Sequence, residues 1–124
     1  MWGGINRRKF PRASYRCLIQ MSKKDSTKSI STHTENIGSG GICVIIKDNL
    51  GLFQGVNLEV ILEDSNVPIK CSGTVVWVVK KRAEKLSEGY MFDTGIEFVG
   101  LSEKDISRIE QIIKTIIEKE SPSP

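Results

Sequence analysis

The feature of this chain that most constrains its fold is a change from short strand-like segments to one helical segment at its end. The strand-like segments are rich in apolar and β-branched residues and are separated by polar or glycine-containing turns. They span residues 13–21, 27–35, 42–46, 56–63, 67–80 and 90–99. Six short strands at this spacing, two of them carrying Gly73 or Gly95 where a bend or bulge is expected, predict a mostly β domain closed into a barrel.

The last segment has a helical period instead. Ser102 is the expected N-cap, and Glu103 and Asp105 fall in the first turn, where the helix dipole favours negative charge. The apolar positions that follow form one stripe, and they are Ile106, Ile109, Ile113, Ile116 and Ile117. We expect this stripe to cover an open end of the barrel, with a dimer or partner helix as the alternative.

Length and cysteine content place the chain in a broad class. With 124 residues it is long enough for one domain with its own core. It has no run of ~20 apolar residues that could span a membrane, and residues 1–6 lack the apolar stretch of a secretory signal. Cys17, Cys43 and Cys71 are odd in number and widely spaced, which is typical of buried thiols in a reducing compartment. These features predict a cytoplasmic protein.

Charge is unevenly distributed along the chain. Residues 1–34 carry eight Lys and Arg against one acid, whereas residues 35–124 carry ten against fourteen. An anionic partner is therefore expected at the basic end. His33 is the only histidine, and no catalytic pair or metal-ligand spacing can be assembled around it, so the sequence predicts neither an enzyme nor a metal site.

Three of the six arginines, Arg7, Arg8 and Arg12, lie within six consecutive residues. Guanidinium carries a planar fork of donors that matches phosphates and the Hoogsteen edge of guanine. A glycine-rich segment, residues 36–41, follows 24 residues after Arg12, and we expect its glycines to allow positive φ angles and to offer backbone N–H groups. Taken separately, the two segments could be a solvated basic tail and an ordinary tight turn.

Together, an Arg-x-x-x-Arg element and a following (Asp/Asn)-x-Ser-x-x-Gly element resemble the signature of the PilZ domain. Arg8 and Arg12 match the two arginines, Arg7 the extra preceding one, and Asn36 and Gly41 the ends of the second element. Gly38 stands where the family has serine, and Ser39 lies one place later. The stretch 95–99 followed by a helix is also typical of the family.

The resemblance implies a six-stranded antiparallel barrel with a C-terminal helix, and a bacterial receptor for the second messenger cyclic di-GMP rather than an enzyme. It implies ligand contacts, some of them to an intercalated cyclic di-GMP dimer, from Arg7, Arg8, Arg12, Asn36, Gly38, Ser39, Gly41 and Trp77. Trp77 is included because an indole can stack on guanine, although a core or surface tryptophan is the alternative. Trp2 is a weaker candidate for stacking.

The expected organisation is a flexible arm (1–12), the barrel with its helix (13–120) and a frayed tail (121–124). Three functions remain open on the sequence. The first is a cyclic di-GMP receptor that relays the signal to a protein partner. The second is a PilZ-like interaction module that has lost or weakened nucleotide binding, which the glycine at position 38 favours. The third, an RNA-binding barrel, lacks interleaved aromatic and basic residues, so a nucleic acid polymer is not an expected partner.

Overall fold

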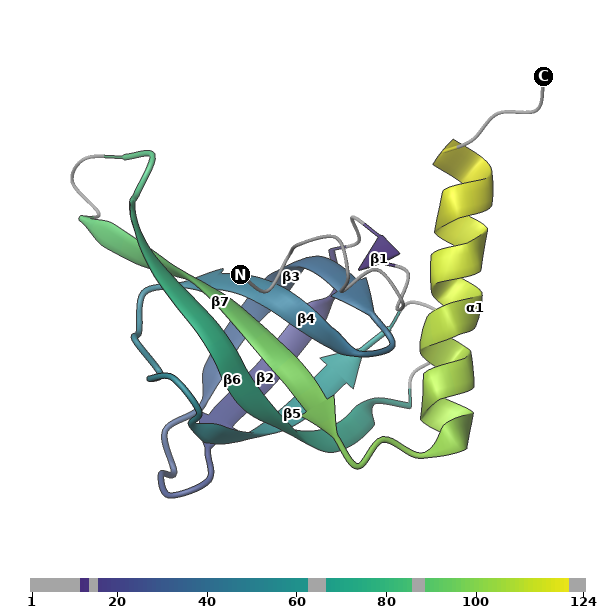
Figure 1. Ribbon diagram of the computed structural model, residues 1–124, viewed down its shortest axis with the longest axis horizontal. Coiled ribbons are helices and arrows are strands. Elements are labelled where there is room, and N and C mark those ends of the chain that lie inside the picture. Colours follow the sequence, from purple (N-terminus) through teal and green to yellow (C-terminus); the bar gives the residue numbers. More distant parts are fainter. Residues whose placement is uncertain (1–11, 14–15, 63–66, 86–88, 121–124) are drawn as a thin grey trace.

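The computed structural model describes residues 12–13, 16–62, 67–85 and 89–120, and its strands form a closed antiparallel barrel (Figure 1). The strands are β1 (Arg12–Ala13), β2 (Leu18–Lys23), β3 (Ile30–Gly38), β4 (Gly41–Ile46), β5 (Gly55–Ile61), β6 (Ile69–Arg82) and β7 (Tyr90–Val99). The pairings run β2–β3–β4–β7–β6–β5 and back to β2. The expected six-stranded barrel is therefore confirmed, with β1 as a short addition beside β3.

The first expected strand, residues 13–21, is present but interrupted. Its two parts, β1 and β2, both pair with β3, through Arg12 opposite Gly38 and Leu18 opposite His33. The register shifts by one residue between these two pairings, so the ladder cannot continue without a break. Near the break, the Cys17 N–H donates to Thr34 Oγ1 at 3.0 Å, and the Thr34 N–H donates to the Cys17 carbonyl at 3.0 Å.

The remaining strands differ from expectation mainly at their ends. Residues 90–99 match β7 and residues 42–46 match β4 to within one residue, whereas β3 begins later and runs further than the expected 27–35. The glycine-rich turn is consequently reduced to Ser39 and Gly40. The reason is Ile37, whose fully buried side chain keeps β3 in the sheet beyond residue 35.

The barrel interior is filled by alternate residues of the strands. Four residues in neighbouring strands are fully buried and form one continuous row, Ile37, Ile42, Ile96 and Val75. A Cβ added to Gly73 would lie only 2.6 Å from Ile96 Cγ2, so that glycine allows close packing inside the barrel. The expected irregularity of β6 occurs later than Gly73, between Val75 and Trp77.

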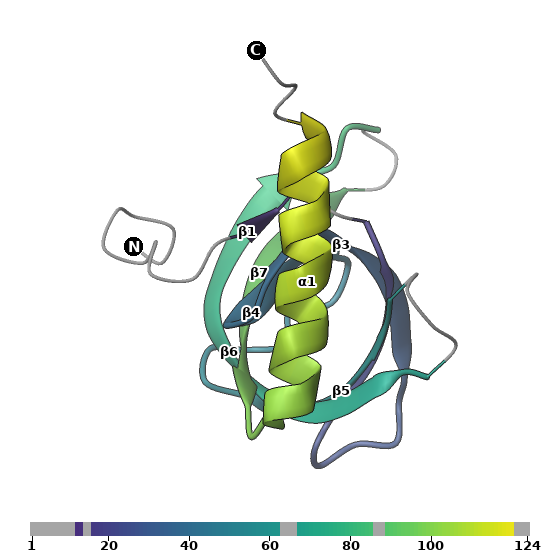
Figure 2. The same ribbon diagram turned by 90° about the vertical axis from the view of Figure 1, so that its right-hand side faces the viewer.

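The helix α1 (Glu103–Glu120) begins as expected, with the Asp105 N–H donating to Ser102 Oγ at 3.1 Å. Ile109 and Ile113 are buried, whereas Ile117 is 41% exposed and Ile112 packs on the core instead. The expected stripe was therefore wrong at Ile117, which is turned away from the barrel. Figure 2 shows α1 crossing one open end of the barrel, where it contacts β1 and β3. Among the described residues no helix is long and apolar enough to cross a membrane.

Candidate ligand-binding site

The pairing of β1 with β3 joins the two sequence motifs. Arg12, the last arginine of the first motif, is the direct register partner of Gly38 in the second. Residues 24 or more apart in sequence thus become neighbours at one edge of β3. Arg7 and Arg8 lie outside the described residues, and of Arg12 only the backbone is described.

The second motif is divided between two strands. Asn36 and Gly38 belong to β3, Ser39 is buried in the turn, and Gly41 opens β4. The expectation of positive φ angles here was wrong, since left-handed backbone among the described residues occurs at Phe53, Gly51, Gly89 and Gly100. A Cβ at Gly41 would instead overlap the carbonyl oxygen of Ile96. The absent side chain at Gly41 therefore serves the close approach of β4 to β7.

A row of four residues crosses the outer face of the barrel from the motif to the predicted stacking residue. Register pairs Asn36 with Cys43, Cys43 with Gly95, and Gly95 with Trp77. We call this set the site row. Side chains alternate between the faces of a strand, and the adjacent row, from Ile37 to Val75, fills the interior. The site row therefore faces outward.

Two β-bulges direct the ends of the site row outward. In β3 the bulge lies between Thr34 and Asn36, and in β6 it lies between Val75 and Trp77. Without the extra residue, period-two alternation would place Asn36 on the face of Thr34, which is 1% exposed, and Trp77 on the face of Val75, which is 0% exposed. Bulges of this kind often re-aim side chains beside functional sites.

The amide of Asn36 has unused hydrogen-bonding capacity. Its Oδ1 atom is buried and accepts no hydrogen bond from the part of the chain that the structure describes. A buried polar atom left without a partner costs about 1–3 kcal/mol of stability. A ligand donor could satisfy this oxygen only after displacing the groups that now cover it.

Trp77 is half-buried and lies on the outer face, so the barrel-surface alternative describes its position better than the core alternative. A Cβ added to Gly95 would overlap three adjacent carbons of the indole, Cδ2, Cε3 and Cζ3, at nearly equal distances. The six-membered ring therefore lies face-on against Gly95. One face of the ring is covered by β7. The part of the indole that is exposed to solvent is therefore the rest of the ring.

Asp93, which sequence reasoning missed, lies beside the site row and receives three donors. Cys43 Sγ donates to Oδ1 at 2.9 Å, Lys81 Nζ lies 3.1 Å from Oδ2, and Trp77 donates a further side-chain hydrogen bond. Burial of the carboxylate raises its pKa, but these hydrogen bonds and the charge of Lys81 outweigh burial, so the pKa of Asp93 is below its ordinary value. Its partners lie on two other strands, so no local pattern in the sequence identifies it.

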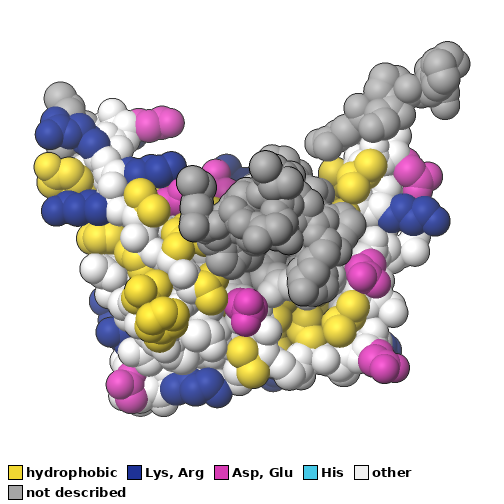
Figure 3. Space-filling model, in the orientation of Figure 1, with side chains coloured by type: hydrophobic (Ala, Val, Ile, Leu, Met, Phe, Trp, Pro, Cys, Tyr) yellow, Lys and Arg dark blue, Asp and Glu magenta, His cyan; other side chains and the backbone are white. Residues whose placement is uncertain are grey.

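Positively charged residues follow Trp77 at the end of β6. Lys80, Lys81 and Arg82 end the strand, with Lys80 Nζ 4.2 Å from the ring centroid of Tyr90. Figure 3 shows Lys and Arg side chains gathered at the upper left, near the β6–β7 hairpin, with hydrophobic side chains over the neighbouring strands. Residues 81 and 82 lie beyond the end of the expected strand 67–80. As strand residues they add cations near the site row, which suits an anionic ligand.

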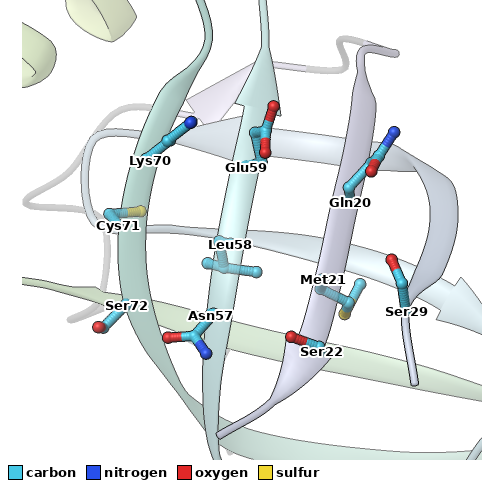
Figure 4. Close-up of a pocket in the computed structure, with 10 residues that line it drawn as sticks. All are labelled: Gln20, Met21, Ser22, Ser29, Asn57, Leu58, Glu59, Lys70, Cys71 and Ser72. Atoms are coloured by element: carbon cyan, nitrogen blue, oxygen red, sulfur yellow. The ribbon is translucent and has the colours of Figure 1, made fainter. Parts of the chain in front are cut away.

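A separate polar groove of about 410 Å³ crosses the outer surface of β2, β5 and β6 (Figure 4). Two cross-strand rows form it, Gln20–Glu59–Lys70 and Ser22–Asn57–Ser72. It contains none of the residues expected to bind ligand and no aromatic side chain. The groove therefore gives no support for a different nucleotide site.

Comparisons with known proteins agree on the family. A family model of the PilZ domain matches residues 6–115. The Bacillus subtilis inhibitor of motility is 21% identical with a TM-score of 0.75, covering 95% of this chain and 55% of that one. The PilZ domain of Escherichia coli YcgR, solved with c-di-GMP, is 12% identical with a TM-score of 0.71, covering 92% and 94%. The c-di-GMP complex of K. pneumonia MrkH is 17% identical with a TM-score of 0.69, covering 94% and 55%.

The comparison with curated proteins finds no match. At the identities above, the solved structures establish a shared fold, and this chain spans little more than half of the Bacillus and MrkH chains. The family model, in contrast, covers most of the chain, including both motifs and most of the helix. The chain belongs to the PilZ domain family.

Proposed function

We propose that this chain is a bacterial, cytoplasmic receptor for cyclic di-GMP and that it passes the signal to a protein partner. PilZ domains are binding modules rather than enzymes, and the solved neighbours that carry c-di-GMP support this class of ligand. The observation that supports the proposal most is the pairing of Arg12 with Gly38, because the backbone of the last motif arginine lies beside the second motif.

The chemistry at this edge matches the ligand. Cyclic di-GMP carries two phosphates and two guanines, and each arginine can donate two parallel hydrogen bonds to either group. A bidentate contact to guanine discriminates against the wrong base by about 1–3 kcal/mol. Arg7, Arg8 and Arg12 are the proposed donors, and three guanidinium groups suit the four phosphates of an intercalated dimer.

The other residues of the proposed site contact the guanine bases or form the surface beneath the ligand. The buried Oδ1 of Asn36 can accept a hydrogen bond from a guanine amino or imino group. Gly38, Ser39 and Gly41 form the backbone against which the ligand lies. Trp77 offers a ring for stacking, which contributes about 1–3 kcal/mol per base.

Calorimetric titration of the purified chain with cyclic di-GMP tests the proposal. We expect a dissociation constant in the micromolar range or tighter, and two ligands per chain if the intercalated dimer binds. Cyclic di-AMP is the matched control because it has the same phosphates and ring but a different base edge, and it should bind at least about tenfold more weakly.

A protein-interaction module without ligand binding is the second candidate function. It is favoured by Gly38, which lacks the hydroxyl of the family serine and so removes a hydrogen bond worth about 0.5–1.5 kcal/mol. This function predicts no heat and no change in melting temperature at saturating cyclic di-GMP. Such a result would reject the receptor and leave the interaction module.

A further inference from the structure

Asp93 holds a position that the proposed ligand contacts do not explain. Its carboxylate is bound by Cys43 at 2.9 Å and Lys81 at 3.1 Å, and the Trp77 side chain donates to it as well. The three donors come from β4 and from two positions of β6, on both sides of β7. Through these side-chain interactions, Asp93 connects β4, β7 and β6, the three strands that carry the site row between Cys43 and Trp77.

These contacts fix the orientation of the indole. The ring packs face-on against Gly95, which prevents it from moving toward the sheet. The only donor of an indole side chain is its N–H, so the bond to Asp93 also fixes the rotation of the ring in its own plane. A ring restrained in both ways is pre-organised, and a ligand that stacks on it does not have to immobilise it.

We propose that Asp93 is a positioning residue that locks Trp77 against Gly95, so that the other face of the indole is a preformed stacking surface for a guanine of the ligand. This inference rests on the proposed function and adds to it the residue that organises its aromatic contact. Cys43 and Lys81 act in turn on Asp93, by holding its two oxygens in place.

Electrostatics alone predicts the opposite role for this carboxylate. A negative charge near two phosphates weakens binding, so its neutralisation would be expected to strengthen binding. Lys81 offsets part of that repulsion through its ion pair with Asp93. The sign of the change in affinity on Asp93→Asn therefore separates the positioning role from a simple charge effect.

Fluorescence of the ligand-free protein tests the lock itself. The chain has two tryptophans, so Trp77 is the sole indole in a Trp2→Phe parent. In that parent, Asp93→Asn should lower the emission anisotropy of Trp77 and increase its quenching by acrylamide. Asp48→Asn is the matched control, because it makes the same charge change at an exposed ion pair with Lys28, and it should leave both signals unchanged. Unchanged signals in Asp93→Asn would overturn the lock, and a circular dichroism melt checks that the variant is folded.

Calorimetry in the wild-type background tests the consequence for binding. Asp93→Asn should weaken cyclic di-GMP binding about twofold to tenfold, the cost of immobilising one free side chain. Trp77→Phe keeps an aromatic ring but cannot donate to Asp93, so adding Asp93→Asn to it should weaken binding less than in the wild type. Equal or tighter binding by Asp93→Asn would overturn the positioning role. So would a loss of affinity on Asp93→Asn that is as large in the Trp77→Phe variant as in the wild type. If the wild type itself does not bind, the proposed function fails, while the fluorescence still decides whether Asp93 locks the ring.

Discussion

Replacement of Gly95 by alanine should disrupt the packing of the Trp77 indole against β7. The new Cβ would lie 2.5 Å from Cδ2 of the indole, which is about 1 Å closer than ordinary contacts between carbon atoms allow. The indole must therefore move away from β7. Overpacking of this kind costs about 1–3 kcal/mol. For a domain of 124 residues, each kcal/mol lowers Tm by about 4 °C, so we expect a loss of about 4–12 °C. Thermal and urea unfolding followed by circular dichroism measure it.

A double-mutant cycle identifies the cause of that loss. If the clash with the ring is responsible, Gly95→Ala should be close to neutral once Trp77 is replaced by valine. Gly95 is not among the glycines with positive φ, so backbone strain gives no competing explanation. Gly55→Ala is the matched control in another strand, because its Cβ would meet only the flexible side chain of Lys24, at 3.3 Å. If Gly95→Ala lowers stability as much in the Trp77→Val background as beside Trp77, the clash with the indole is not the cause of the loss.

Three further predictions concern the motifs and the thiols. Arg12→Ala should weaken cyclic di-GMP binding by at least about 2 kcal/mol, or roughly thirtyfold, with little change in Tm; affinity like that of the wild type would move the site elsewhere. Gly38→Ser should retain or increase affinity, because Gly38 lies in β3 without positive φ; a clear loss in a variant that melts normally would count against the serine's role here. Burial and the charge of Asp105 raise the pKa of the Cys71 thiol from 9.0 to about 11. Because this thiol loses its proton at a lower pH in the unfolded chain than in the folded chain, the free energy of unfolding falls as pH rises between these two values. Cys71→Val should reduce this alkaline loss in urea titrations, and an identical loss would exclude Cys71 as its source.

Much of the fold could be predicted from the sequence because alternation and turn residues are local signals. Residues 90–99 lie between a charged segment and Gly100, and they form β7 with the expected ends. Residues 27–35 were placed too early because the glycines suggested a wide turn, whereas burial of Ile37 extends β3 to Gly38. Ile117 was misplaced because helical spacing alone does not decide how wide a stripe the barrel covers.

The candidate site was predictable only in part. The motif residues were identified from spacing, and the structure brings Arg12 and Gly38 together through a pairing that the sequence does not specify. The bulges that turn Asn36 and Trp77 outward depend on cross-strand register, which is a non-local property. Asp93 was missed for the same reason, since its partners Cys43 and Lys81 lie on two other strands.

Nuclear magnetic resonance can locate the bound ligand and so test whether cyclic di-GMP binds at the two motifs. On titration of the isotope-labelled chain with cyclic di-GMP, the largest amide shifts should occur at Asn36, Gly38 and Gly95, together with the indole N–H of Trp77. The polar groove of Figure 4, followed at Gln20, should remain unchanged. Shifts centred on that groove, or no shifts at saturating ligand, would show that the two motifs do not form the binding site.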